Sequence, residues 1–182
     1  MYQSTPWHNY ALIAHLARRA HGKKLGKTKI QKLMYFLVAV KNIPVDYFYR
    51  FHTYGPYCDE LAGDVDYLAA INCLNVSFEI STRGYTIEAG EKAEWLENKA
   101  QHFIQEHKEE ISEVIDRLGS QNVRELELLA TLLYLTKQEE SCRNSYHNLE
   151  QRVQELKPHF STAEVKKAFS ELEVRGYVGK KR

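Results

Sequence analysis

Residues 1–45 contain no aspartate or glutamate, although the whole chain of 182 residues has 24 of them. This segment carries a charge of +8 and the rest carries −7, so the net charge of +1 conceals the asymmetry. Such a separation predicts either a surface that binds an anion or one that binds the acidic part of a second copy. The eight cations are Arg18, Arg19, Lys23, Lys24, Lys27, Lys29, Lys32 and Lys41.

Long apolar runs and paired cysteine motifs are also missing. No run approaches the roughly 20 residues of a membrane helix, and the N-terminus lacks the apolar segment of a signal peptide. The three cysteines, Cys58, Cys73 and Cys142, form no Cys-x-x-Cys pair, which is typical of a reducing compartment. We therefore expect a cytoplasmic protein with no membrane segment, whose 43% of hydrophobic residues suffices for a core.

The sequence lacks the glycine-rich motifs that bind phosphates or dinucleotides, and it lacks the Gly-x-Ser-x-Gly motif of serine hydrolases. His102 and His107 are five positions apart, and His8 and His15 are seven apart. Neither pair has the i, i+4 spacing that places two imidazoles on one edge of a helix. We expect surface or packing histidines, with no metal and no cofactor.

Cys58 precedes a predicted helix, whose N-terminus would lower the pKa of its thiol. Asp59 and Glu60 oppose that effect, and no histidine is placed to activate the thiol. With Asp64 and Asp66, these carboxylates suit either acid–base chemistry or a solvated helix face. Because the solvated face explains them as well, we expect a protein that is not an enzyme.

The clearest structural pattern lies in residues 27–57. A helical stripe of apolar residues predicts a core helix that Thr28 caps and that ends before Pro44. Aromatic residues over 47–52 predict a short strand, and Gly55-Pro56 predicts a turn with Pro56 at the first position of a third helix. The apolar stripe holds Ile30, Leu33, Met34, Leu37, Val38 and Val40, and the opposite side holds Lys29, Gln31, Lys32 and Tyr35.

The runs Lys-Ile-Gln-Lys-Leu-Met-Tyr-Phe-Leu (29–37) and Phe-His-Thr-Tyr-Gly-Pro-Tyr (51–57) resemble the YwgA-like proteins, a poorly characterised prokaryotic family with a winged-helix-like core. The chain is more distantly similar to the Panacea (SocA-like) antitoxin domain, and the run 127–131 also resembles the YwgA-like C-terminal part. The resemblance implies a prokaryotic regulator and, through Panacea, an antitoxin that neutralises a protein toxin. It implies no catalytic residues. The motif residues that carry it are Gln31, Lys32, Leu33, Tyr35, Tyr54, Gly55 and Pro56.

The order of predicted elements is that of a winged helix. Three helices precede a hairpin with alternating apolar residues at 76–80 and 85–87, and a long helix then spans about 90–118, with a break near His107. Capping boxes at Asn122/Glu125 and Ser161/Glu164 begin later helices. We expect a mainly α fold with a small β-hairpin wing, divided into a winged-helix-like core (1–118) and a three-helix extension (119–182).

The basic residues suggest two kinds of partner. Seven of them, together with Arg83 in the wing, predict a surface that contacts phosphates without reading sequence. The alternative is a solvated surface or one that faces another subunit in a homodimer. The third helix, which enters the major groove in many winged helices, is acidic and opposes DNA binding. We therefore favour a regulator or adaptor that binds a protein, such as a toxin, with double-stranded DNA as the alternative. The predicted patch comprises Arg18, Arg19, Lys23, Lys24, Lys27, Lys29, Lys32 and Arg83.

Overall fold

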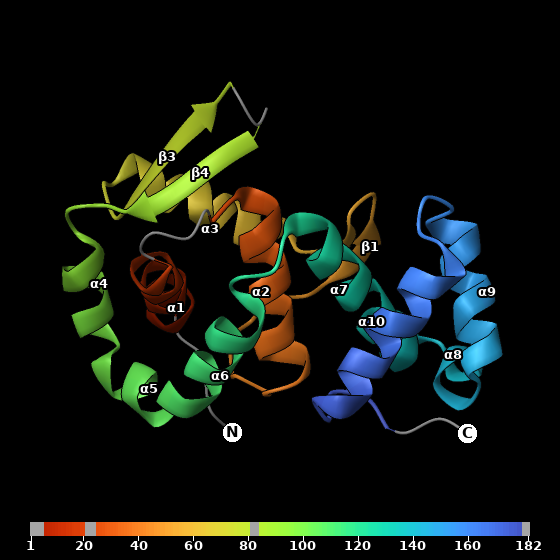
Figure 1. Ribbon diagram of the computed structural model, residues 1–182. Coiled ribbons are helices and arrows are strands. Elements are labelled where there is room, and N and C mark those ends of the chain that lie inside the picture. Colours follow the sequence, from red (N-terminus) through yellow and green to blue (C-terminus); the bar gives the residue numbers. More distant parts are fainter. Residues whose placement is uncertain (1–5, 21–24, 81–83, 180–182) are drawn as a thin grey trace. The chain divides into compact units, whose positions relative to one another are not determined.

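The computed structural model describes residues 6–20, 25–80 and 84–179, and it is mainly helical with a small antiparallel hairpin (Figure 1). This confirms the predicted fold class. The chain forms two compact units, one within residues 1–50 and 57–121 and the other within 51–56 and 122–182. The predicted division at 118/119 differs from this in two respects, because the boundary lies at 121/122 and because the segment 51–56 packs with the C-terminal helices. No helix among the described residues is both long and apolar enough to span a membrane.

The N-terminal unit contains six helices and a hairpin within its described residues. Helix α1 packs against α4, and α2 packs against α6. The elements are α1 (Pro6–Arg19), α2 (Lys27–Ala39), α3 (Asp59–Ala70), β3 (Leu74–Glu79), β4 (Gly84–Ala89), α4 (Ala93–Lys99), α5 (Gln101–Glu106) and α6 (Lys108–Leu118).

Helix α2 is the core helix, and it is buried on almost every side. Each residue from Lys29 to Leu37 is buried, including those predicted to lie on a polar face. A helix surrounded by others cannot keep a solvated side, so its polar side chains are enclosed as well. The predicted cap at Thr28 is wrong, because Gly26 is the N-cap residue and makes no side-chain hydrogen bond.

The aromatic stretch after α2 forms less strand than predicted. Only Arg50–His52 (β1) is extended and paired, and its partner is Gly55–Tyr57 (β2), so Pro56 lies in a strand. Gly55 has a φ of 84°, a conformation that favours glycine at this turn. Helix α3 begins at Asp59 rather than Pro56, because the Cys58 sulfur accepts a hydrogen bond from the Leu61 amide and caps it.

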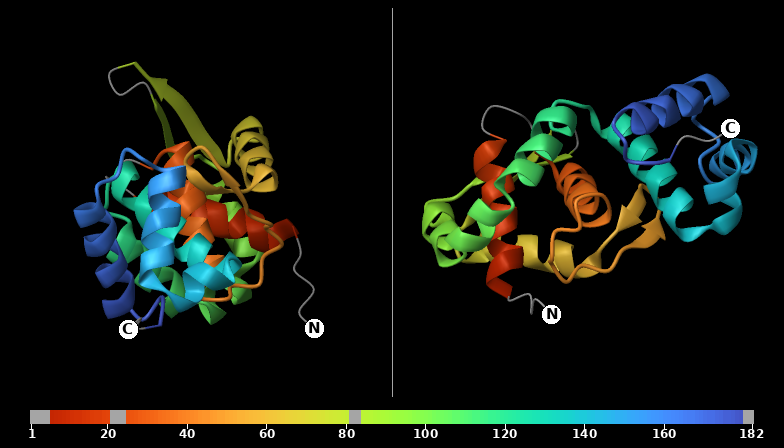
Figure 2. Two further views of the ribbon diagram at one scale, coloured as in Figure 1. Left: turned by 90° about the vertical axis from the view of Figure 1, so that its right-hand side faces the viewer. Right: turned by 90° about the horizontal axis from the view of Figure 1, so that it is seen from below.

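The hairpin β3–β4 projects from the helices of its unit (Figure 2). Its register pairs Val76 with Ile87 and Phe78 with Tyr85, so the alternating residues of the predicted hairpin lie opposite one another. Ile87 is buried at the base, and its amide donates to the Leu25 carbonyl at 2.7 Å. The predicted turn residues 81–83 lie outside the described residues. Beyond the hairpin, the predicted long helix is interrupted at Ala100 and His107, giving α4, α5 and α6.

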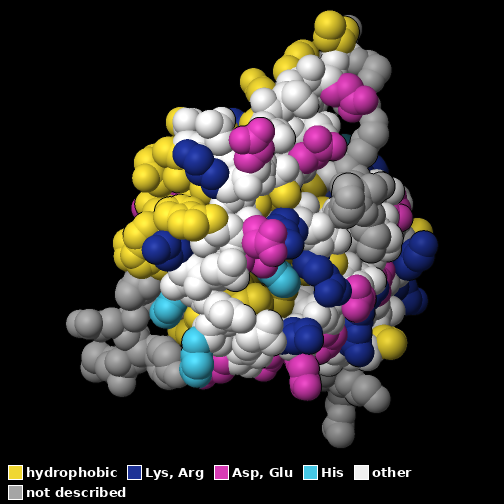
Figure 3. Space-filling view, turned by 90° about the vertical axis from the view of Figure 1, so that its left-hand side faces the viewer, with side chains coloured by type: hydrophobic (Ala, Val, Ile, Leu, Met, Phe, Trp, Pro, Cys, Tyr) yellow, Lys and Arg dark blue, Asp and Glu magenta, His cyan; other side chains and the backbone are white. Residues whose placement is uncertain are grey.

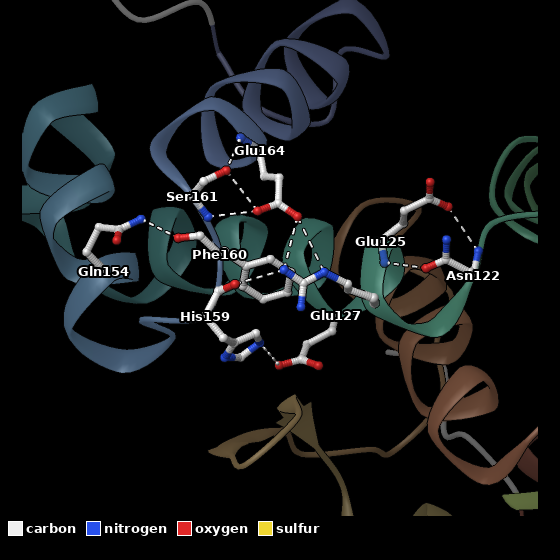
Figure 4. A network of polar contacts seen from close by, with 9 residues as sticks. Asn122, Glu125, Glu127, Gln154, His159, Phe160, Ser161 and Glu164 are labelled. Carbon is white, nitrogen blue, oxygen red and sulfur yellow. Dashed lines mark hydrogen bonds and ion pairs between the residues drawn. The ribbon is translucent and has the colours of Figure 1, made fainter. Parts of the chain in front are cut away.

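The C-terminal unit is built from α7 (Val123–Gln138), α8 (Glu140–Asn144), α9 (Tyr146–Leu156) and α10 (Thr162–Val174). Both predicted capping boxes are confirmed, at Asn122/Glu125 and at Ser161/Glu164 (Figure 4). The extension predicted to hold three helices has a fourth, the short α8. Arg124 joins α7 to the start of α10, with donor distances of 3.0 Å to Glu164 and 2.8 Å to the His159 carbonyl.

A buried ion pair holds the segment 51–56 within this unit. The Lys157 ammonium lies 2.7 Å from the Glu127 carboxylate, and it also donates to the carbonyl of Thr53. Lys157 is 2% exposed and Glu127 is 6% exposed. The His159 ring lies 3.7 Å from the same carboxylate oxygen (Figure 4). These contacts explain why residues distant in the sequence belong to one compact unit.

Candidate functional site

The predicted basic surface begins at the end of α1, where two arginines approach acidic side chains of their own unit. The Arg18 guanidinium lies 3.2 Å from Glu97 and 3.9 Å from Glu94. The Arg19 guanidinium lies 3.9 Å from Asp116. Both arginines remain partly exposed, but the neighbouring carboxylates offset their charge and weaken their attraction for phosphates.

The described lysines that follow, Lys27, Lys29 and Lys32, do not continue this surface. Lys27 lies 2.6 Å from Asp66, while Lys29 is 8% exposed and Lys32 is 1% exposed. The predicted exposure of Lys29 and Lys32 is therefore wrong, because α2 is buried along its whole length from Lys29 to Leu37. The remaining members of the predicted patch, Lys23, Lys24 and Arg83, lie outside the described residues.

The four carboxylates of α3 are each engaged by a neighbour within the N-terminal unit. Asp59 lies 2.7 Å from Arg50, and Asp64 accepts a hydrogen bond of 2.7 Å from Tyr47. Burial raises the pKa of the Asp64 carboxyl, although the Tyr47 hydroxyl acts in the opposite sense. The remaining two accept from Cys58 and from Lys27. This helix presents an acidic surface, unlike the basic recognition helices that enter DNA.

Cys58 is a structural cap rather than an activated nucleophile. The residue is 0% exposed, and its thiol donates to Glu60 at 3.1 Å. Burial first, and then the Glu60 carboxylate, raise the pKa of the Cys58 thiol to about 12, although the Leu61 amide that donates to the sulfur opposes them. A thiol with this pKa is almost entirely protonated near neutral pH and is a poor nucleophile.

The described histidines do not converge on a metal site. The His8 ring stacks on Phe103 with ring centroids 4.3 Å apart, and the His107 ring lies edge-on to Phe103 at 5.0 Å. Burial, and then the nearby His107, lower the pKa of His8. Across residues 6–20, 25–80 and 84–179, no cluster of three or more histidine, cysteine or acidic side chains is arranged to hold a metal ion.

The residues of the family-like motif have structural roles and fall in both units. Leu33 and Tyr35 are buried in α2, where the Tyr35 ring lies 4.9 Å from that of Tyr49. Gln31 contacts the backbone at the start of α3. Tyr54, Gly55 and Pro56 belong to the C-terminal unit. Tyr54 is 59% exposed, so it does not pack in the core as Tyr35 does.

The most distinctive surface of the N-terminal unit is a group of four aromatic rings from three helices, which we call the aromatic face: Trp7, Tyr10, Tyr67 and Trp95. The Trp7 ring lies 6.3 Å from both Trp95 and Tyr10, and Tyr10 lies 5.5 Å from Tyr67. Trp7 is 45% exposed, and Tyr67 and Trp95 are each 49% exposed. Figure 3 shows hydrophobic side chains gathered on this side of the molecule.

Two lysines border the aromatic face at the two ends of α4. Lys92, the N-cap residue, and Lys99, the last residue of the helix, are exposed and lie three positions before and four positions after Trp95, spacings that place side chains on one side of a helix. The Lys99 ammonium lies 5.2 Å from the centre of the Trp95 ring, within the range of a cation–π interaction. Figure 3 shows basic side chains on the border of this hydrophobic area.

Sequence reasoning missed the aromatic face, because its rings come from positions as far apart as 7 and 95. The available signal was local to α1 and α4. Trp7 and Tyr10 are three positions apart, and Trp95 lies directly between a charged residue, Glu94, and an apolar one, Leu96. The chain has no significant match among protein-family models or curated proteins.

Proposed function

We propose that this chain is a non-enzymatic prokaryotic regulator or adaptor that binds a protein partner through the aromatic face. The observation that carries the proposal is the contiguity of Trp7, Tyr10, Tyr67 and Trp95 at the surface. Tryptophan and tyrosine are enriched among the residues that dominate binding energy at protein interfaces. Single exposed rings are common, whereas a contiguous exposed apolar patch marks an interaction site.

The character of α3 supports a protein partner over duplex DNA. In a winged-helix arrangement this helix would approach the phosphates, and its carboxylates would repel them. The burial of Lys29 and Lys32 removes two of the cations that favoured the DNA alternative. The Cys58 thiol is protonated and caps α3, which likewise supports a binding function rather than catalysis. The resemblance to the Panacea domain makes a protein toxin the first class of partner to test.

The test is reconstitution with a purified partner. A tagged chain is used to purify a bound protein from its native cells, and the partner is then produced separately and titrated by calorimetry. We expect a stoichiometric complex that Trp95→Ser weakens by about tenfold or more, as for an interface hot spot. Phe48→Ser is the matched control, because Phe48 is an aromatic residue of the same unit that is 81% exposed. Equal loss in both variants, or salt-dependent binding of duplex DNA in place of a protein complex, contradicts the proposal.

A further inference from the structure

We infer that the aromatic face receives an acidic, apolar segment of its partner, with carboxylates of that segment on Lys92 and Lys99. This inference rests on the proposed protein-binding function and specifies the chemistry of the partner. An apolar face alone does not select its occupant. The charges around the face determine which segment binds, since complementary charge at an interface sets specificity and the rate of encounter.

The lysines of the border are available to a partner. Among the described residues, neither Lys92 nor Lys99 forms an ion pair. The two carboxylates of α4, on Glu94 and Glu97, lie near Arg18 instead. Glu91 is exposed beside Lys92, so the α4 border offers two cations and one unpaired carboxylate.

At the opposite end of the aromatic face, the cation that the described residues place beside Tyr67 is Lys27, and it is already paired with a carboxylate. There, Tyr67 lies on α3 between Asp66, which pairs with Lys27, and Leu68, which is buried. Asp64 lies one turn earlier on the same helix. Burial raises the pKa of Tyr10, and the nearby Asp64 carboxylate raises it further. A bound segment would therefore place its carboxylates at the Trp95 end and apolar side chains toward Tyr67.

Single-stranded nucleic acid is the other anion that aromatic rings and lysines attract, and the geometry favours it less. Bases stack on ring faces that present a continuous platform. Here the rings of Trp7 and Trp95 are inclined at 85°, and those of Trp7 and Tyr10 at 88°. Edge-to-face rings form a ridged surface that suits interdigitating aliphatic side chains better than flat bases. The carboxylates Asp64 and Asp66 would also repel a phosphate backbone that crossed the face.

Trp7 and Trp95 are the two tryptophans of the chain, so its intrinsic tryptophan fluorescence reports on this surface. A phage-displayed peptide library is panned on the wild-type chain and counter-selected against the double variant Trp7→Ser/Trp95→Ser. We expect the enriched peptides to combine aspartate or glutamate with leucine, phenylalanine or methionine. A synthetic peptide of that type should change the intrinsic tryptophan emission on titration.

The charge variants decide whether the lysines select the peptide. Lys92→Glu/Lys99→Glu should weaken peptide binding by about tenfold or more, since each reversal replaces attraction with repulsion. Lys166→Glu/Lys167→Glu on α10 is the control and should bind as the wild type does. Equal binding by both variants, enrichment of neutral or basic peptides, or no enrichment over the tryptophan variant overturns the inference.

The proposed function and the inference fail in distinguishable ways. If the reconstituted partner complex survives Lys92→Glu/Lys99→Glu but not Trp95→Ser, the aromatic face binds protein and the acidic specificity is wrong. If Trp95→Ser leaves that complex intact, both are wrong. If a thymidine oligonucleotide changes the tryptophan emission and the lysine variant abolishes this, the face binds single-stranded nucleic acid instead.

Discussion

The Gln31 side chain joins α2 to the start of α3 by pairing with the backbone of Cys58 on both sides. Its Nε2 donates to the Cys58 carbonyl at 2.8 Å, and the Cys58 amide donates to its Oε1 at 3.0 Å. Gln31 is 3% exposed and Cys58 is 0% exposed. Because water does not reach this position, the Gln31 side chain supplies the acceptor that the Cys58 amide requires, and it adds a second donor to the Cys58 carbonyl, which also accepts from the Ala62 amide.

Gln31→Leu should destabilise the N-terminal unit substantially. The substitution keeps a similar volume but leaves the buried Cys58 amide unsatisfied, at a cost of about 1–3 kcal/mol, while the Cys58 carbonyl keeps its hydrogen bond from the Ala62 amide. Urea unfolding followed by circular dichroism measures the loss. Gln105→Leu, at an exposed position of α5, is the control and should change the stability little. A Gln31 variant as stable as this control would show that the two hydrogen bonds contribute nothing.

Breaking the Lys157–Glu127 pair should destabilise the C-terminal unit more than any surface pair does. Lys157→Met leaves the Glu127 carboxylate buried without its cation, which typically costs about 3–5 kcal/mol. Replacing both residues, as Lys157→Met/Glu127→Leu, should recover most of the loss of stability, because two apolar side chains leave no buried charge without a counter-charge. Lys166→Met on exposed α10 is the single-lysine control.

A double-mutant cycle measured by chemical denaturation separates these effects. The expected result is strong coupling between positions 127 and 157. Replacement of Lys157 should also loosen the segment 51–56 from the other residues of its unit, because the Lys157 ammonium donates to the Thr53 carbonyl. Additive losses in the double variant would mean that each side chain acts alone and that the pair does not hold this unit together.

Cys58 should resist alkylation while the chain is folded. Burial and the Glu60 carboxylate raise the pKa of its thiol to about 12, so at pH 8 very little thiolate is present and access is blocked. Iodoacetamide treatment, followed by mass spectrometry of the Cys58 peptide, should show slow modification in the native state and rapid modification in urea.

The variant Glu60→Gln identifies which cause dominates. It removes the carboxylate but leaves the sulfur buried, so the native modification should stay slow. Rapid native labelling of Cys58 in the wild type would indicate an activated thiol and would reopen a catalytic role for this position.

Features that depend on neighbours in sequence were predictable, and those that depend on distant packing were not. The hairpin and both capping boxes follow from spacings of a few residues, and the structure confirms them. Lys29 and Lys32 were placed on a solvated face, because an amphipathic pattern cannot show that α2 is enclosed on all sides. The segment 51–56 joins the C-terminal unit through Lys157, more than 100 positions later.

The candidate site was beyond sequence reasoning for the same physical reason. Charge composition drew attention to a basic N-terminal segment, but composition does not report which cations meet carboxylates. The pairing of Arg18 with Glu97 and of Lys27 with Asp66 depends on tertiary structure. The aromatic face likewise requires α1, α3 and α4 to bring Trp7, Tyr67 and Trp95 to one surface.

The start of α10 should give the C-terminal unit a distinctive acid sensitivity. The Ser161 amide, then the Ser161 hydroxyl, and then Arg124 donate to Glu164 and lower the pKa of its carboxyl to about 2, from an ordinary value of 4.5. A carboxyl with a lowered folded-state pKa binds fewer protons when folded than when unfolded. Its stabilising contribution is therefore complete above about 4.5 and is lost as the pH falls through about 2.

Glu164→Gln should accordingly be less stable than the wild type at pH 7, and the difference should shrink steadily between pH 4.5 and pH 2. Thermal unfolding by circular dichroism across this range measures it. Glu140→Gln, at an exposed position of α8, controls for the loss of a carboxylate as such and should show no comparable convergence. A difference between wild type and Glu164→Gln that stays constant from pH 7 to pH 2 would show that the capping hydrogen bonds do not depend on the charge of Glu164.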